Sequence, residues 1–196
     1  MPAFYQQFLL SFSLILSSTG LLARETLFQS GYELAGYGGP EILITELNGQ
    51  DAMIVGGQGA GLWGNDLYGL SIGVAGYATP GRLELKTSNE SFQLGYGGMT
   101  LGFSRNPGNL MHWKTDAFLG AGQVWITDNS TSFEVAKGNI LVLELSAGAD
   151  INLTNHLQMG ISSSWRIISN PQVRDLTGKA LSGLGVKLSF EFGRFE

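Results

Sequence analysis

The amino-acid sequence predicts an all-β protein, an eight-stranded antiparallel up-and-down transmembrane β-barrel with an N-terminal signal peptide. This prediction depends on three observations. Residues 183–192 alternate between apolar side chains and small or charged ones. The chain holds 29 glycines but only 14% charged residues, a composition that suits a sheet better than helices, because glycine has a high entropic cost in a helix. An apolar run near the N-terminus has the length of an export signal.

The alternation is clearest in residues 183–192. One face carries Leu184, Val186, Leu188, Phe190 and Phe192, and the other carries glycine, serine, Lys187 and Glu191. Successive side chains of a strand point to opposite faces, so the segment has one apolar face and one face of small and ionic residues. This pattern is typical of a barrel strand in a lipid bilayer.

The first 23 residues have the pattern of a secretory signal peptide. Residues 8–16 are an apolar run, and Ser17, Ser18, Thr19 and Gly20 follow it. The run is too short to span a bilayer as a helix. Cleavage after Gly20 or after Ala23 fits the sequence, and an uncleaved anchor or a core helix is the alternative. We therefore divide the chain into a signal peptide at 1–23, a polar lead-in at 24–38 and a barrel at 39–196.

Eight strands are expected in the barrel, as the length of 196 residues allows. Period-two alternation bounded by turn residues places them at 40–47, 52–63, 67–78, 92–104, 111–126, 140–153, 157–168 and 183–192. Asn48-Gly49 predicts a hairpin turn between the first two strands. In the fourth strand the alternation changes phase at Gly97-Gly98, which predicts a glycine bulge.

The connections between these strands differ in length. Those after the second, fourth and sixth strands are short, whereas residues 80–91, 128–139 and 170–180 form long loops. Outer-membrane barrels have short periplasmic turns and longer outward loops. An even number of strands places both termini on the short-turn side. The first connection is the exception, because it is short on the outward side.

Ionisable residues on the glycine-rich faces are expected to line the interior, since a charge on the lipid face near the midplane costs about 2–4 kcal/mol. The predicted lumen network consists of Lys114, Asp116, Glu144, Asp150, Arg166, Lys187 and Glu191. An eight-stranded barrel is only wide enough for its own side chains, so we expect these residues to pair, as in Glu144–Arg166–Lys187, and to fill the lumen. A polar relay or narrow conduction path is the alternative.

Five aromatic residues lie near the ends of predicted strands: Trp63, Tyr68, Trp113, Trp125 and Trp165. In a transmembrane barrel they would form girdles at the two membrane interfaces. In a soluble barrel they would be core residues.

The sequence offers little for catalysis or cofactor binding. It has no cysteine, which excludes disulfides and thiolate metal sites. His112 and His156 lie at short turns, where a histidine is most often a solvated side chain. We predict no catalytic, cofactor-binding or metal-binding residue and no enzyme. A net charge of −5 and a pI near 5.0 argue against nucleic acid as a partner.

The chain resembles the small eight-stranded outer-membrane β-barrel proteins of Gram-negative bacteria. The resemblance covers residues 30–195 and depends on the alternating strands, the signal-like start and the ending Phe190-Glu191-Phe192-Gly193-Arg194-Phe195. The segments Gly38-Gly39-Pro40, Asn48-Gly49, Val55-Gly56-Gly57 and Gly95-Tyr96-Gly97-Gly98 contribute to it. It implies the fold, the outer membrane and the barrel assembly machinery, which recognises a terminal aromatic; here Glu196 follows Phe195.

We therefore expect an integral outer-membrane protein with a plugged ionic lumen and a structural or surface-interaction role through its long loops. Its expected partners are outer-membrane lipids and the assembly machinery, without a cofactor, and the protein is expected to be a monomer. One alternative is a small solute-permeation pore of the same fold. The other is a soluble periplasmic barrel that binds an apolar ligand and turns Leu184, Val186 and Phe190 inward.

Overall fold

The computed structural model describes residues 33–193, with the exception of residues 66, 86–87 and 174–175. These residues belong to one compact unit, Tyr32–Glu196. The signal peptide expected at 1–23 and residues 24–32 of the expected lead-in lie outside the described residues. Residues 33–38 belong to the first strand, which starts earlier than the sequence indicated.

The described residues form nine strands and one short helix. They are β1 (Glu33–Leu47), β2 (Gln50–Gly64), β3 (Tyr68–Ala78), β4 (Leu83–Glu84), β5 (Glu90–Arg105), β6 (Met111–Asp128), β7 (Glu134–Thr154), β8 (Leu157–Ile168), α2 (Gly178–Leu181) and β9 (Gly183–Gly193). Among these residues, no helix is long and apolar enough to cross a lipid bilayer.

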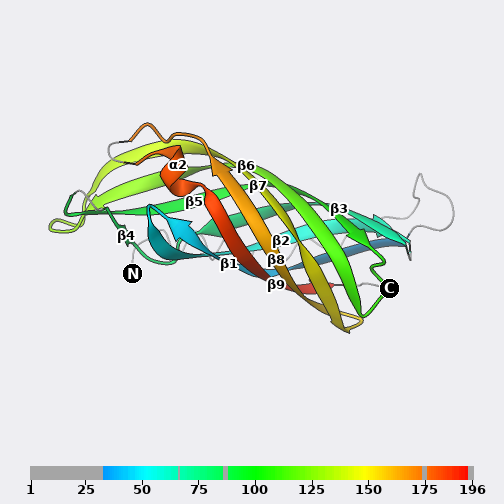
Figure 1. The fold of residues 1–196 in the computed structure, drawn as a ribbon. Coiled ribbons are helices and arrows are strands. Elements are labelled where there is room, and N and C mark those ends of the chain that lie inside the picture. Colours follow the sequence, from blue (N-terminus) through cyan, green and yellow to red (C-terminus); the bar gives the residue numbers. More distant parts are fainter. Residues whose placement is uncertain (1–32, 66, 86–87, 174–175, 194–196) are drawn as a thin grey trace. The chain divides into compact units, whose positions relative to one another are not determined.

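The eight long strands close into an antiparallel barrel, as the sequence predicted. Each pairs with its neighbour in the chain, in the order β3-β2-β1-β9-β8-β7-β6-β5, and β3 pairs with β5 to complete the ring. The first and last strands meet from Tyr37 opposite Gly193 to Thr45 opposite Gly185. The two-residue β4 lies beside β5 (Figure 1).

The two ends of the barrel differ. The short-turn end holds the connections 65–67, 106–110 and 155–156, and both terminal strands start or end there. The long-connection end holds 48–49, 79–89, 129–133 and 169–182. Figure 1 shows α2 and β4 at this second end.

The prediction of a long loop at 128–139 is wrong. β6 and β7 continue to pair as far as Thr127 opposite Glu134, so only residues 129–133 form the connection. The other long connections also hold ordered segments, β4 and α2. Thr177 caps α2, because its hydroxyl accepts a hydrogen bond from the Ala180 backbone N–H.

The glycine bulge predicted at Gly97-Gly98 is absent. The pairing of β5 with β3 and β6 is continuous there, and the described strands shift register at Ile126/Thr127 and Asn152/Thr154 instead. The change of phase in the apolar pattern of β5 has another cause. Leu94 and Tyr96 are apolar residues that point inward and are buried, whereas Met99 is an apolar residue that points outward. The interior of the barrel therefore becomes apolar at this level, while the strand itself remains regular.

The apolar faces of the strands point outward. Leu184, Val186 and Phe190 are 73%, 45% and 38% exposed, whereas Lys187 and Glu191 between them are buried. The same holds on the other walls, where Val74, Leu101, Leu119, Leu141 and Ile161 are exposed. A surface of this kind needs apolar surroundings. The inverted soluble barrel with an inward apolar ligand site is therefore wrong.

The outward apolar surface ends at one level near the long connections. There the outward side chains change from apolar to polar on four strands. The outward residue that follows Ile44 toward the long connections is Glu46, and Asp51 follows Met53, Gln123 follows Ala121 and Asn139 follows Leu141 in the same way. Along β6, ten residues separate Trp113 from Gln123. At about 3.4 Å per residue and a tilt near 40°, they span about 26 Å of barrel axis. This is the height of the apolar band of a membrane barrel.

A charge in the middle of the apolar band should destabilise the barrel. We expect Val74→Arg to lower the free energy of unfolding by about 2–4 kcal/mol, because Val74 faces outward near mid-height. The control Asn139→Arg, at the edge of the band, should change it by about 0–1 kcal/mol. Urea unfolding in lipid vesicles measures both variants. Equal effects would contradict the assignment of the band.

Candidate functional site

The barrel interior has two zones. The zone toward the short turns holds charged and polar side chains from β1, β2, β6, β7, β8 and β9. The zone toward the long connections is an apolar core. The aromatic rings of Tyr77, Tyr96 and Phe118 separate the zones, with ring centroids 5.3–5.7 Å apart.

A first ionic cluster surrounds Lys114 on β6. Its Nζ lies 2.5 Å from Glu191 Oε1 and 3.6 Å from Asp150 Oδ2. Gln58 Nε2 donates a second hydrogen bond to Glu191 Oε1 at 2.8 Å. The ammonium also lies 4.6 Å from the centroid of the Tyr37 ring, which is a cation–π contact. Lys114 thus connects strands on opposite walls of the barrel.

A second ionic cluster surrounds Lys187 on β9. Its Nζ lies 2.6 Å from Glu144 Oε1 and 3.9 Å from Glu41 Oε2. The Tyr77 hydroxyl donates to Glu41 Oε2, and the Tyr77 ring lies 5.4 Å from the ammonium. Both carboxylates are almost fully buried. A buried charge needs partners of this kind, because its desolvation is otherwise uncompensated.

Arg166 differs from the sequence-based expectation. It lies opposite Glu144 in the β7–β8 register, but the ion pairs of the described residues include none between the two. Its Nε and Nη2 donate to the Leu181 carbonyl at 3.3 Å, and Nη2 also donates to Thr45 Oγ1 at 3.3 Å. The guanidinium therefore holds the last residue of α2 in the mouth of the barrel.

The structure places the remaining expected lumen residues in the same zone. Asp150 lies beside Lys114, and Asp116 lines a small cavity with Lys114, Lys187 and Glu191. Glu41 was not predicted to line the interior, although it lies in the strand expected at 40–47, because both faces of that segment carry apolar residues and its inward face could not be told from the sequence. The inward positions of Tyr37, Gln58 and Tyr77 were not predicted either.

The two histidines differ in their surroundings. His112, expected to be solvated, is buried inside the short-turn end, and its Nε2 lies 3.9 Å from Asp150 Oδ2. The reason is the strand alternation, which turns residue 112 inward as the second residue of β6. His156 is exposed in the β7–β8 turn.

The apolar zone lies inside the barrel at the long-connection end. It is built from inward side chains of the strand ends: Leu43, Leu47, Ile54, Phe92, Leu94, Val124, Ile126, Ile140, Val142 and Ile168. Leu85, Leu176 and Leu181 from the long connections cover it and are buried. The sequence does not predict this zone, because nothing in the sequence distinguishes an inward leucine from a lipid-facing one.

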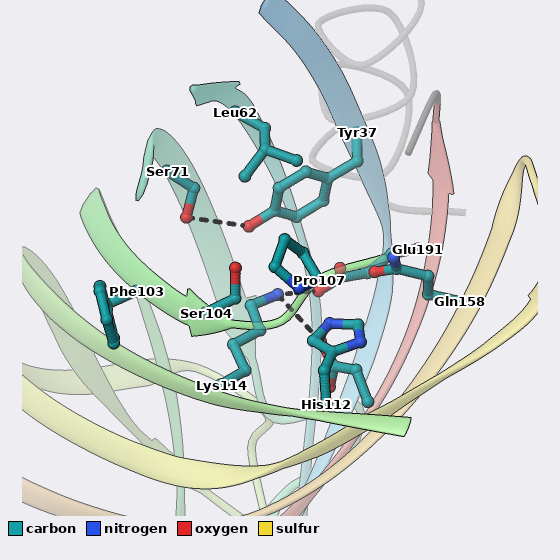
Figure 2. Close-up of a pocket in the computed structure, with 11 residues that line it drawn as sticks. Tyr37, Leu62, Ser71, Phe103, Ser104, Pro107, His112, Lys114, Gln158 and Glu191 are labelled. Atoms are coloured by element: carbon teal, nitrogen blue, oxygen red, sulfur yellow. Dashed lines mark hydrogen bonds and ion pairs between the residues drawn. The ribbon is translucent and has the colours of Figure 1, made fainter. Parts of the chain in front are cut away.

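Two small cavities remain in the ionic zone. Figure 2 shows the first, where Tyr37, His112, Lys114, Gln158 and Glu191 approach one another from different strands. The space in which the centre of a water molecule can lie has a volume of about 20 Å³ in the first cavity and about 10 Å³ in the second. A water needs about 10–15 Å³ on this measure, so the first cavity has room for one or two waters and the second for one at most.

The described residues contain no group of three or more His, Asp or Glu arranged to hold a metal ion. Chemically, the interior holds more carboxyl groups than cations: Glu41, Asp116, Glu144, Asp150 and Glu191 face Lys114, Lys187 and Arg166.

The five aromatic residues expected at the interfaces occupy different levels. Trp63, Tyr68 and Trp113 lie at the short-turn end, and Trp125 lies beside the polar edge of the apolar band. Trp165 of β8 pairs with Leu145 of β7, and Leu145 pairs with Ala117 of β6. Ala117 precedes Trp125 by eight residues on β6. Although Trp165 is near the end of β8, the stagger of the strands therefore places it nearer to the short-turn end than Trp125.

The β6–β7 hairpin extends past the apolar band and has an ordered tip. Asp128 Oδ1 accepts hydrogen bonds from the backbone N–H groups of Ser130 and Thr131, at 2.8 and 2.9 Å. The N–H groups of Thr131 and Ser130 lower the pKa of Asp128, because they favour its charged form. Asn89 braces the tip, since its amide donates to Ser130 Oγ at 2.8 Å. Phe133 is 73% exposed beside this turn.

Comparison with solved structures identifies the fold. Neisserial surface protein A (NspA) superposes with a TM-score of 0.53 at 9% identity, covering 85% of this chain and 100% of that one. Ail, the attachment invasion locus protein of Yersinia pestis, solved with the heparin analogue sucrose octasulfate, gives 0.54 at 13% identity, covering 84% and 99%. The fold is therefore that of the small outer-membrane β-barrels, as the resemblance indicated. No protein-family model and no curated protein sequence matches the chain.

Removing the cation of the first cluster should destabilise the barrel. Lys114→Met leaves Glu191 and Asp150 buried without their shared partner. We expect the free energy of unfolding to fall by about 3–5 kcal/mol in lipid vesicles, as when one member of a buried ion pair is removed.

The matched control is Lys179→Met on α2, an exposed lysine, which should change the free energy of unfolding by less than about 0.5 kcal/mol. Adding Glu191→Leu to Lys114→Met should recover part of the loss, because it removes one of the two unpaired carboxylates. A Lys114→Met variant as stable as the wild type would contradict the paired interior.

Proposed function

We propose that the chain is an integral β-barrel of the bacterial outer membrane with a closed interior and a role at the cell surface. The observation that carries this proposal is the sidedness of the strands. Outward apolar side chains form a band of membrane height, and charged side chains point inward, where Lys114 and Lys187 pair with carboxylates. The fold likeness to NspA and Ail supports the location.

A closed interior favours a structural or surface role over solute permeation. Charged and polar side chains leave only small cavities in the ionic zone, and Leu85, Leu176 and Leu181 cover the apolar zone beyond it. Arg166 fastens α2 in the mouth of the barrel. An eight-stranded barrel has an interior just wide enough for its side chains. We assign no catalytic role to any residue.

The orientation follows from the connections. Membrane barrels of this type carry short turns on the periplasmic side and longer connections outside. We therefore place the long-connection end at the cell surface and both ends of the barrel chain in the periplasm. Assembly by the barrel assembly machinery and a monomeric state belong to the same proposal.

The β6–β7 hairpin is the best candidate for surface contacts. Its tip is ordered before any partner binds, through Asp128 and Asn89, and it presents Phe133 and Val135 exposed. A rigid tip loses little conformational entropy on binding, and aromatic anchors dominate many interfaces.

The charge of the segments at the long-connection end argues against a polyanionic ligand there. Residues 79–91, 128–139 and 169–182 carry five Lys or Arg and five Asp or Glu. The heparin analogue bound by Ail is a sulfated anion, and a balanced surface lacks the excess positive charge that such a ligand needs. We therefore propose a protein partner that contacts the hairpin through apolar as well as polar groups.

Cysteine labelling tests location and orientation together. The chain has no cysteine, so a single Gly81→Cys or Gly108→Cys provides a unique thiol. Both glycines have open space where a side chain would be added, and they lie in connections at opposite ends of the barrel. On intact cells a membrane-impermeant maleimide should label Gly81→Cys only, and Gly108→Cys should react after permeabilisation. The reverse pattern would contradict the orientation, and labelling of both would contradict a membrane-spanning barrel.

Conductance separates the closed barrel from the permeation alternative. Purified protein inserted into planar bilayers should show no single-channel steps, because the apolar zone blocks the axis. Reproducible steps of constant size in wild-type protein would favour the pore instead.

A further inference from the structure

A patch of outward polar side chains lies at the edge of the apolar band on three adjacent strands. We define this edge patch as Gln93 of β5, Gln123 and Trp125 of β6, and Lys137 and Asn139 of β7. The register places Gln93, Trp125 and Lys137 in one row and Gln123 beside Asn139 in the next. All five side chains therefore point outward over one small area of the wall.

The edge patch is held in shape by contacts within the wall. Gln123 Nε2 donates to Asn139 Oδ1 at 3.0 Å, so the two amides are fixed against each other. The Trp125 ring lies along the wall over Gly95, where an added Cβ would be only 3.3 Å from the ring. Because the ring lies along the wall, it does not cover the side chains of Gln93 and Lys137, which flank Trp125 on the neighbouring strands.

The neighbouring outward residues show where the edge patch lies along the barrel axis. Ala121 and Leu141 form the last apolar row, and the next row toward the long connections is Gln123 and Asn139. At such an edge a membrane barrel meets the lipid headgroups. The patch therefore faces the polar parts of lipids, and the apolar wall beneath it faces their acyl chains.

The patch carries one positive charge. Lys137 is exposed, and the ion pairs between described residues do not include it. On the opposite wall the outward residues at the same level are Glu46 and Asp51, which face each other across β1 and β2. An anionic headgroup is thus favoured at the edge patch and disfavoured on the other wall.

We propose that the edge patch binds the phosphate of a membrane-lipid headgroup. Lys137 supplies the ammonium, and the amide nitrogens of Gln93 and Asn139 supply neutral hydrogen-bond donors around it. The acyl chains of the same lipid would lie on the apolar wall below, along Leu141 and Leu143. This proposal depends on the membrane location of the barrel but not on its orientation or its surface partner.

Native mass spectrometry of the full-length barrel in detergent micelles tests the proposal. The probes are dioleoyl phosphatidic acid and dioleoylglycerol, which share their acyl chains and differ in the phosphate. We expect the wild type to retain phosphatidic acid at least about tenfold more strongly than dioleoylglycerol. Lys137→Gln should lower the retention of phosphatidic acid about tenfold, since it removes a charge-assisted contact. The matched control Lys179→Gln, an exposed lysine outside the patch, should retain it as the wild type does.

Three results would overturn the proposal: equal retention by Lys137→Gln and wild type, retention of dioleoylglycerol as strong as that of phosphatidic acid, or displacement of the lipid by millimolar inorganic phosphate. The last would show a free-phosphate site rather than a lipid site. Heat-dependent migration on gels reports whether each variant is folded, and the exposed position of Lys137 makes a folding defect unexpected. A wild-type chain that shows no heat-dependent migration would instead contradict the membrane barrel itself.

Discussion

The structure depends on the closure of the sheet. In a bilayer, water cannot satisfy the backbone N–H and C=O groups of an edge strand, so every strand needs two neighbours. The chain meets this condition by pairing β1 with β9 and β3 with β5. Closure also fixes the sidedness, because alternate residues of each strand must then face lipid or the interior. The outward apolar band and the inward charges are two consequences of the same constraint.

Closure with eight strands leaves an interior that side chains must fill. Here the filling changes along the axis, from ion pairs around Lys114 and Lys187 to an apolar core beyond Tyr77, Tyr96 and Phe118. In the ionic zone, Lys114 and Lys187 each pair with carboxylates of other strands. The apolar zone extends to the mouth, where Arg166 anchors α2. The interior of the barrel therefore has a polar part toward the short turns and an apolar part toward the long connections.

The sequence predicted the sheet because alternation has a direct physical cause, the opposite orientation of successive side chains. Residues 183–192 show this, and the structure confirms both the strand and the direction of its apolar face. The interior was harder to predict. Leu94 belongs to the core, yet it carries the same apolar signal as an outward residue, so the phase change wrongly predicts a bulge. The contact of Arg166 with Leu181 is tertiary, and no spacing in the sequence indicates it.

Adjacent residues of one strand face lipid and interior in turn. Methyl NMR in lipid nanodiscs that contain a lipid with a spin label in its acyl chain can test this alternation. Leu143 is exposed and Val142 is fully buried, although they are neighbours on β7. We expect the spin label to broaden the Leu143 methyl signals strongly and to affect those of Val142 much less. Equal broadening of the two residues, or broadening of Val142 alone, would contradict the account.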